Sequence, residues 1–159
     1  MEIRLRPWQP EDSAAIHTLF HAAINQLADA DYSQEQRQQW AHPSLDLPFW
    51  QQRLAGTTPT VAVINGEIAG FVELIMDEAY IDCLYVHPDF ARQGVGSILL
   101  QSVLNQALIA RLPRLQVDVS LTAEPLFRRM GFTGLQENRH ERGGVVLTNL
   151  RMEKQLLPV

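Results

Sequence analysis

Apolar residues recur along the chain with two periods, one typical of strands and one typical of helices. Ile3, Leu5 and Pro7 alternate with charged residues, which predicts a first strand over residues 2–8. Apolar positions three and four residues apart then predict an amphipathic helix that begins near Pro10. Its expected apolar face consists of Ala14, Ile16, Leu19, Phe20, Ala23, Ile24 and Leu27.

The segment between residues 29 and 54 is the least regular part of the chain. Ser33 followed by Gln36 predicts a short capped helix. Pro48 is expected to break the chain before a second short helix over residues 49–54. Five ring-bearing residues gather in this segment: Tyr32, Trp40, His42, Phe49 and Trp50. Two roles stay open for them, because aromatic rings can cover a core or line a pocket for an amine.

The remaining β-rich segments predict a sheet that mixes antiparallel and parallel pairs. Strands are expected over residues 58–64, 67–76, 80–86, 115–119, 132–138 and 145–153. Asn65-Gly66 predicts a tight hairpin between the first two of these. A long helix separates residues 80–86 from residues 115–119, so these two strands should be parallel neighbours. A short helix over residues 121–130 is expected to end at Gly131 as a left-handed cap.

The junction between the strand over residues 80–86 and the long helix carries the clearest chemical signal. The first N–H groups of a helix lack intrahelical partners, and the helix dipole makes this end partly positive. Gly94 and Gly96 leave the backbone accessible to an anion, and Arg92 adds a positive charge. These residues alone leave two interpretations open, a phosphate site or a turn that binds nothing.

The amino-acid sequence of this stretch resembles the signature motif of a known family. The segment LYVHPDFARQGVGSILL, residues 84–100, is similar to the signature of the GCN5-related N-acetyltransferase (GNAT) family. The family pattern of Arg or Gln, two residues, Gly, one residue and Gly or Ala falls on residues 91–96, and Ala91 departs from its first position. Phe127-Arg128-Arg129-Met130-Gly131-Phe132 resembles a later family segment.

The resemblance covers most of the chain and implies one N-acetyltransferase domain over residues 1–159. The implied fold is α/β (α+β), a mixed and mostly antiparallel seven-stranded sheet with helices on both faces. Its fourth and fifth strands are parallel and splay apart.

The resemblance also implies acetyl-CoA (coenzyme A) as the cofactor. Backbone groups of Leu84 and Val86 would pair with its pantetheine arm, as an added strand would. Backbone N–H groups from a single loop would hold its pyrophosphate: Arg92, Gln93, Gly94, Val95, Gly96 and Ser97. Phe127 would lie near the thioester. Each apolar residue of this set has an alternative role in the core.

The transfer reaction requires a neutral amine, although an alkylamine with a pKa near 10 is almost wholly protonated at pH 7. A group must therefore accept its proton. Asp82 is the first candidate and Glu73 the second. Period-two alternation predicts that Tyr80, Asp82, Leu84 and Val86 share one face of their strand.

The leaving thiolate presents a second requirement. Many family members place a proton-donating tyrosine four residues before the Gly131 position, where this chain has Phe127, which cannot donate. Tyr80 or Tyr85 could donate instead. For the acceptor amine, Tyr32, Trp40 and Tyr85 are the expected binding residues.

Composition and net charge limit the binding partners and the cellular location that we expect. The net charge of −5 argues against general nucleic-acid binding. No apolar run reaches the ~20 residues that a bilayer crossing needs, and the charged N-terminus is unlike a signal peptide. The single cysteine, Cys83, excludes an internal disulfide and a cysteine-based zinc site, and no metal is expected. These features favour a cytoplasmic location. Because the family often dimerises, a homodimer is also an expectation.

Two main hypotheses follow. The first is an acetyl-CoA-dependent N-acetyltransferase that acts on a primary amine of a small molecule or a peptide. The alternative is a non-catalytic acyl-CoA-binding sensor or partner module of the same fold, which Phe127 motivates. A third hypothesis is another enzyme that binds a phosphate-containing ligand.

Overall fold

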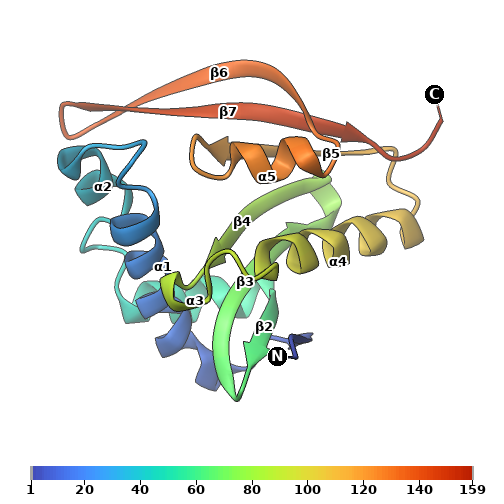
Figure 1. Ribbon diagram of the computed structural model, residues 1–159, viewed down its shortest axis with the longest axis horizontal. Coiled ribbons are helices and arrows are strands. Elements are labelled where there is room, and N and C mark those ends of the chain that lie inside the picture. The colour runs from blue at the N-terminus through green and yellow to red at the C-terminus, as the bar shows by residue number, and fades with distance from the viewer. Residues whose placement is uncertain (1, 159) are drawn as a thin grey trace.

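The computed structural model describes residues 2–158, and their strands form one mixed sheet in the order β1-β2-β3-β4-β5-β7-β6 (Figure 1). The strands are β1 (Arg4–Pro7), β2 (Thr60–Ile64), β3 (Glu67–Ile75), β4 (Tyr80–Val86), β5 (Arg114–Ser120), β6 (Thr133–Arg142) and β7 (Val145–Gln155). The α-helices are α1 (Ser13–Leu27), α2 (Gln34–Trp40), α3 (Leu47–Thr57), α4 (Val95–Ile109) and α5 (Glu124–Arg129). Three short 3-10 helices are η1 (Pro10–Asp12), η2 (Met76–Glu78) and η3 (Pro88–Phe90). The seven-stranded mixed fold predicted from the sequence is confirmed.

Local sequence signals explain several of these boundaries. The Ser33 hydroxyl accepts from the Gln36 N–H, while the Gln36 side chain accepts from the Ser33 N–H, so both halves of the predicted capping box form. Asn65 and Gly66 adopt positive φ angles of 51° and 80° at the hairpin between β2 and β3.

Three local predictions are corrected. Pro48 does not break the chain but lies in the first turn of α3, where a missing N–H costs nothing. The sixth strand continues beyond Asn138 to Arg142, because its pairing with β7 extends to the turn. Ala14 is exposed and therefore does not belong to the apolar face of α1.

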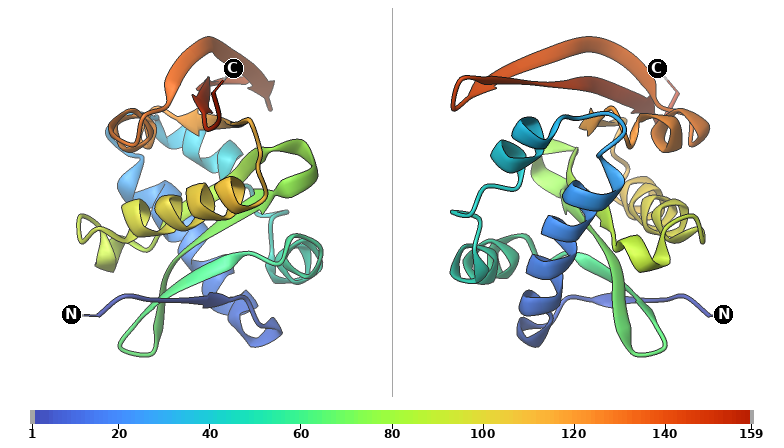
Figure 2. Two further views of the ribbon diagram at one scale, coloured as in Figure 1. Left: turned by 90° about the vertical axis from the view of Figure 1, so that its right-hand side faces the viewer. Right: turned by 60° about the vertical axis from the view of Figure 1, so that its left-hand side comes forward.

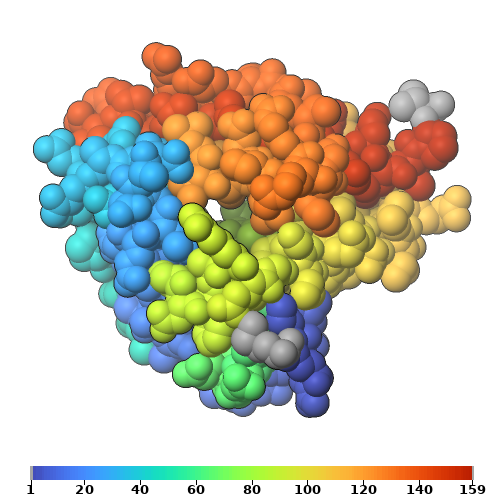
Figure 3. Space-filling view, in the orientation of Figure 1, coloured from blue at the N-terminus to red at the C-terminus, as the bar shows by residue number. Residues whose placement is uncertain are grey.

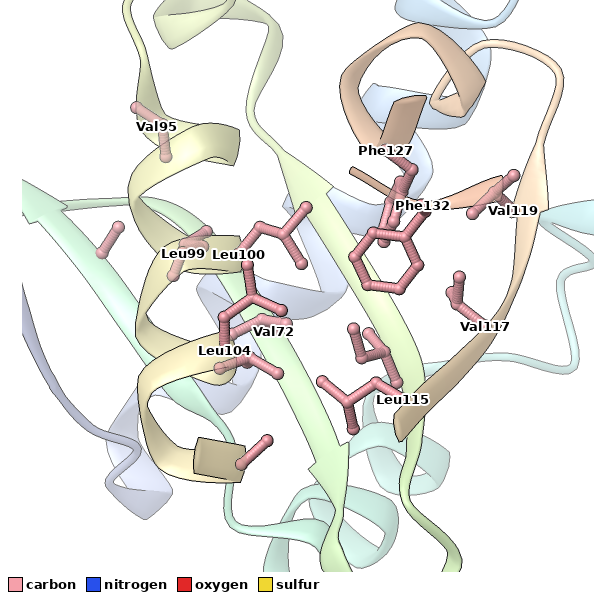
Figure 4. Packing of buried hydrophobic residues seen from close by; sticks show 14 of the residues in the cluster. Val72, Val95, Leu99, Leu100, Leu104, Leu115, Val117, Val119, Phe127 and Phe132 are labelled. Carbon is pink, nitrogen blue, oxygen red and sulfur yellow. The ribbon is translucent and has the colours of Figure 1, made fainter. Parts of the chain in front are cut away.

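One face of the sheet is covered by α4 and α5. Leu99, Leu100 and Leu104 of α4 point toward the strands, as Figure 4 shows, and the same cluster includes Phe127 and Phe132. Gly70 permits the close approach of α4 to β3, because a Cβ there would lie 3.0 Å from side-chain atoms of Val95 and Leu99. This packing fixes the start of α4 beside the end of β4.

The opposite face is covered by α1 and α3, with α2 beyond them (Figure 2). Their buried cluster joins helical residues to β2 and β3: Ile16, Leu19, Phe20, Ile24, Ala41, Trp50, Leu54, Val61 and Phe71. Across residues 2–158, no helix combines the length and apolar character needed to cross a membrane.

The sheet is split between β4 and β5. These parallel strands pair only at Tyr80 with Gln116 and at Ile81 with Val117, whereas β5 pairs with β7 along its whole length. Beyond Ile81 the facing edge of β4 has no strand beside it among the described residues. The predicted parallel and splayed pair is therefore confirmed.

Candidate active site

A pocket of about 440 Å³ lies at the split and is lined by residues from both faces of the sheet. Its walls come from β4, β5, β7 and the end of β6, and from the aromatic segment between α1 and α3. The space-filling view shows a hollow at the centre of one face, bordered by segments around α5 and by the loop before α4 (Figure 3). The split and the pocket thus form one continuous feature.

A β-bulge decides which β4 side chains face this pocket. Glu73 pairs with Cys83 while Leu74 pairs with Ile81, so Asp82 is an extra residue on β4. The bulge brings Asp82 and Cys83 to the same side, where both contact Arg53 of α3.

The prediction that Tyr80, Asp82, Leu84 and Val86 share one face of β4 is therefore wrong in part. Tyr80 and Asp82 lie with the polar side chains of the pocket, whereas Leu84 and Val86 pack with the α4 cluster. The bulge interrupts the alternation on which the prediction relied.

Arg53 joins the two candidate bases. Its Nη2 donates to Oε1 of Glu73 at 2.7 Å and to Oδ2 of Asp82 at 2.8 Å. Glu73 is fully buried, and its second oxygen accepts from Arg53 Nε and from the Thr57 hydroxyl. Because both Glu73 oxygens are occupied, Asp82 is better placed than Glu73 to accept a proton.

Asp82 is the accessible carboxylate of this group. Its side chain is 39% exposed and lines the pocket. Burial raises the pKa of Asp82, although the positive charge of Arg53 opposes the rise. A carboxylate with a raised pKa is a stronger proton acceptor than an ordinary aspartate.

A second polar network lies on the β5 side of the pocket. The Tyr80 hydroxyl donates to Asp118 at 2.7 Å, and Arg151 of β7 donates to both Asp118 oxygens. Burial and the hydrogen bond to Asp118 raise the pKa of Tyr80. Burial alone would raise the pKa of Asp118, but hydrogen bonds from Arg151 and Tyr80 lower it overall. Tyr80 therefore keeps its proton and directs it to Asp118.

Aromatic residues form the opposite wall. Tyr32, Trp40 and Tyr85 all line the pocket, together with Phe20 and Phe49. Trp40 Nε1 donates to the Tyr85 hydroxyl at 3.2 Å, and burial raises the pKa of Tyr85 well above its ordinary value.

The Tyr32 hydroxyl forms hydrogen bonds with two segments that are distant from it in the sequence. Its hydroxyl donates to the Thr148 carbonyl at 2.6 Å and accepts from the Leu121 N–H at 3.0 Å. His42, by contrast, is exposed, bonds to Ser44 and does not line the pocket.

Cys83 and Phe127 also border the pocket. Burial raises the pKa of the Cys83 thiol well above its usual range, which disfavours a thiolate nucleophile. Phe127 is 2% exposed and packs edge-to-face on Phe132. It brings a ring, but no hydroxyl, to the end of the pocket beside α5.

The predicted glycine loop lies at the N-terminus of α4, where Gly94 is the cap with a φ of 85°. Within residues 2–158 the N–H groups of Val95, Gly96 and Ser97 have no hydrogen-bond acceptor, because the first capping bond runs from Ile98 to Gly94. A Cβ on Gly96 would approach Leu126 to 3.0 Å and Leu84 and Val86 to 3.8 Å. The loop is therefore adjacent to the open part of β4.

Arg92 and Gln93 are exposed on this loop, and Arg92 has a positive φ of 61°. The Gln93 side chain donates to the Asp89 carbonyl at 3.4 Å, while no hydrogen bond of the Arg92 side chain is found within residues 2–158.

Some residues of this site were not predicted from the sequence. Arg53, Asp118 and Arg151 are central to its polar networks. The alternation Gln116, Asp118 and Ser120 between buried residues was an available signal for the polar face of β5. Arg53 gave no comparable signal, because its partners lie 20 and 29 residues away.

Comparison with known proteins places this architecture in a class. The protein-family model of the acetyltransferase (GNAT) domain matches residues 28–154 of this chain. The uncharacterised N-acetyltransferase YafP of Escherichia coli (strain K12) is 37% identical over 150 residues, which cover 94% of each chain.

Solved structures agree. A GCN5-related N-acetyltransferase from Rhodopseudomonas palustris superposes with a TM-score of 0.91 at 35% identity, over 98% of this chain and 97% of that one. The PaiA N-acetyltransferase of Thermoplasma acidophilum, solved with coenzyme A, has a TM-score of 0.77 at 17% identity, over 98% and 99% of the chains. At that identity the second likeness concerns the fold alone.

The fold and the comparisons define an N-acetyltransferase. The chain belongs to the GNAT family. The family and the enzyme class predicted from the sequence are confirmed.

Proposed function

We propose that this chain transfers the acetyl group of acetyl-CoA to a primary amine of a small molecule or a peptide. The observation that carries the proposal is the open edge of β4 next to the start of α4. Family membership supports this cofactor, as does the coenzyme A complex of the Thermoplasma PaiA acetyltransferase.

The backbone of β4 fits a pantetheine arm. The His87 N–H donates to the Ala69 carbonyl of β3, and N–H groups alternate in direction along a strand. Those of Leu84 and Val86 therefore point away from β3, into the split. They are available to pair with an extended ligand.

The loop before α4 fits a pyrophosphate. The N–H groups of Val95, Gly96 and Ser97 lack acceptors among residues 2–158. They lie at the positive end of a 15-residue helix. Arg92 and Gln93 are exposed beside them, and Gly94 allows the loop its positive φ. Phe127 then borders the end of the pocket that the thioester would reach.

Acetyl-CoA, when bound, would supply the thioester carbonyl that the amine attacks. Asp82 would accept the ammonium proton, directly or through one water molecule, and Arg53 would hold its carboxylate in place. Glu73 would hold the guanidinium of Arg53 in position through their ion pair rather than act as the base.

Two tyrosines can donate to the departing sulfur. Tyr80 already donates to Asp118, whereas the Tyr85 hydroxyl accepts from Trp40 and has no acceptor for its own proton among residues 2–158. Tyr85 is therefore the better hydrogen-bond donor to the sulfur, while the burial that raises its pKa makes it a weak acid. It would take the place of the hydroxyl that Phe127 lacks. Tyr32 and Trp40 would hold the acceptor amine from the opposite wall.

The first test is calorimetric titration with acetyl-CoA, CoA and ATP, followed by thiol release over a panel of amines. The proposal expects binding of acetyl-CoA, no competition from ATP, and turnover with at least one amine. Binding without any thiol release would contradict catalysis and favour the acyl-CoA-binding sensor. Binding of ATP instead would contradict the proposed cofactor.

The glycine loop offers a matched pair of variants. Gly94 and Gly66 both have positive φ, 85° and 80°, and both face open space where a Cβ would lie. Replacing either by alanine should cost a similar ~1–2 kcal/mol of stability. Only Gly94→Ala should also weaken acetyl-CoA binding, by roughly tenfold or more, because it shifts N–H groups that face an anion. Equal affinity in the two variants would contradict a role for the loop in binding.

A further inference from the structure

The pocket carries opposite charges at two ends. At one end Asp82 and Glu73 face the single guanidinium of Arg53, which leaves one net negative charge. At the β5 wall the negative charge of Asp118 is neutralised by its ion pair with Arg151. The end of the pocket at Asp82 therefore keeps a net negative charge, which attracts a cationic amine.

The other end is formed by β6. His140 and Arg142 line the pocket, and Asn138 reaches Asp118 from the same face of the strand. Arg139 lies on the opposite face and pairs with Glu137 at 3.3 Å. Arg142 forms no ion pair within residues 2–158, so its charge is available to a ligand.

The structure holds this end in place. The turn between β6 and β7 lies over α2 (Figure 1), where Gln36 Nε2 donates to the Val146 carbonyl at 2.9 Å. Gly143 is so close to α2 that a Cβ there would lie 2.7 Å from Gln39 Nε2. Arg142 immediately precedes this anchored turn, so its backbone position is fixed relative to the aromatic wall.

From this arrangement we propose that the acceptor is a zwitterion, a primary amine that also carries a carboxylate. The inference rests on the proposed acetyl transfer. The amine would lie at Asp82, the carboxylate at Arg142 and His140, and the carbon skeleton along Tyr32 and Trp40. Arg142 would then determine specificity, because a guanidinium binds a carboxylate with two parallel hydrogen bonds.

The test compares amines that differ only in the carboxylate. Phenylalanine with phenethylamine, and 4-aminobutyrate with butylamine, cover a short and a long spacing between the charges. We expect one zwitterion to exceed its partner in kcat/KM by about tenfold or more, the contribution of one charge-assisted hydrogen bond. Equal or lower kcat/KM for both zwitterions would overturn the inference.

Variants assign the preference to a residue. Arg142→Gln should reduce the ratio of the two kcat/KM values by about tenfold, and Arg142→Lys should retain part of it. Arg139→Gln, on the other face of β6, should leave the ratio as in the unaltered protein. An unchanged ratio in Arg142→Gln would overturn the assignment.

The experiments distinguish failure of the zwitterion inference from failure of the proposed acetyl transfer. If acetyl-CoA binds and plain amines are acetylated as well as zwitterions, the zwitterion inference fails and acetyl transfer stands. If acetyl-CoA does not bind, the proposed function fails, and the inference fails with it.

Discussion

Replacing Arg53 with methionine would remove the cation that neutralises a fully buried carboxylate. Glu73 is 0% exposed and receives three hydrogen bonds from Arg53 and one from Thr57. Removing one partner of a buried ion pair typically costs about 3–5 kcal/mol, because the other charge stays buried. For a domain of this size, we expect Arg53→Met to lower Tm by roughly 10 °C.

A double-mutant cycle isolates the origin of that loss. Arg53→Met combined with Glu73→Leu removes both charges, and the double variant should be more stable than Arg53→Met alone by about 2 kcal/mol or more. Urea unfolding at pH 7, followed by tryptophan fluorescence, gives the four free energies. Trp50 reports on the region directly, because it is 1% exposed and Arg53 lies 5.5 Å from its ring centre.

The control is the exposed pair of Arg139 and Glu137. Their side chains are 74% and 50% exposed, so Arg139→Met should change the free energy of unfolding by less than about 0.5 kcal/mol. A loss below about 1 kcal/mol in Arg53→Met, or no recovery in the double variant, would refute the assignment of a buried counter-ion role to Arg53.

Two further predictions concern the carboxylates that line the pocket. Asp82→Asn should lower kcat/KM by about 10²- to 10⁴-fold without weakening acetyl-CoA binding, and a smaller loss would contradict its role as the base. Because burial raises the pKa of Asp82, unaltered enzyme should lose kcat/KM on acidification at a higher pH than an ordinary aspartate would dictate, and a pH–rate profile measures this limb. Asp118→Asn should cost about 1–3 kcal/mol of unfolding free energy at neutral pH. The folded-state pKa of Asp118 is lowered, so this contribution is complete above the unfolded value near 3.8 and disappears as pH falls through the folded value; a difference that persists in acid would contradict it.

Much of the fold was predictable because its signals are local. The Ser33 capping box and the Asn65-Gly66 hairpin depend on neighbouring residues, and both form. The order of strands and helices determined the parallel neighbours β4 and β5, since a helical crossover permits little else. The positive φ of Gly94 likewise fits its place before α4.

The site was less predictable because long-range contacts define it. Alternation alone wrongly assigned Leu84 and Val86 to the face of Asp82, since the bulge depends on how β3 pairs with β4. Arg53 reaches Glu73 and Asp82 only after α3 packs on the sheet. Arg142 lines the pocket because the β6–β7 turn is anchored on a helix more than 100 residues earlier, at Gln36.

The bulge in β4 has a consequence for how this site can change through insertion and deletion. Because the bulge absorbs one extra residue, the residues on either side of position 82 keep the faces that regular pairing would give them, with Tyr80 toward the pocket and Ile81 toward α4. A deletion of Asp82 would leave Glu73 opposite Cys83 and Leu74 opposite Ile81, so the two strands would pair regularly and no neighbouring side chain would change face. The pocket would lose only the carboxylate that Arg53 holds. At this position a single insertion or deletion can therefore add or remove an acidic group without rearranging the sheet.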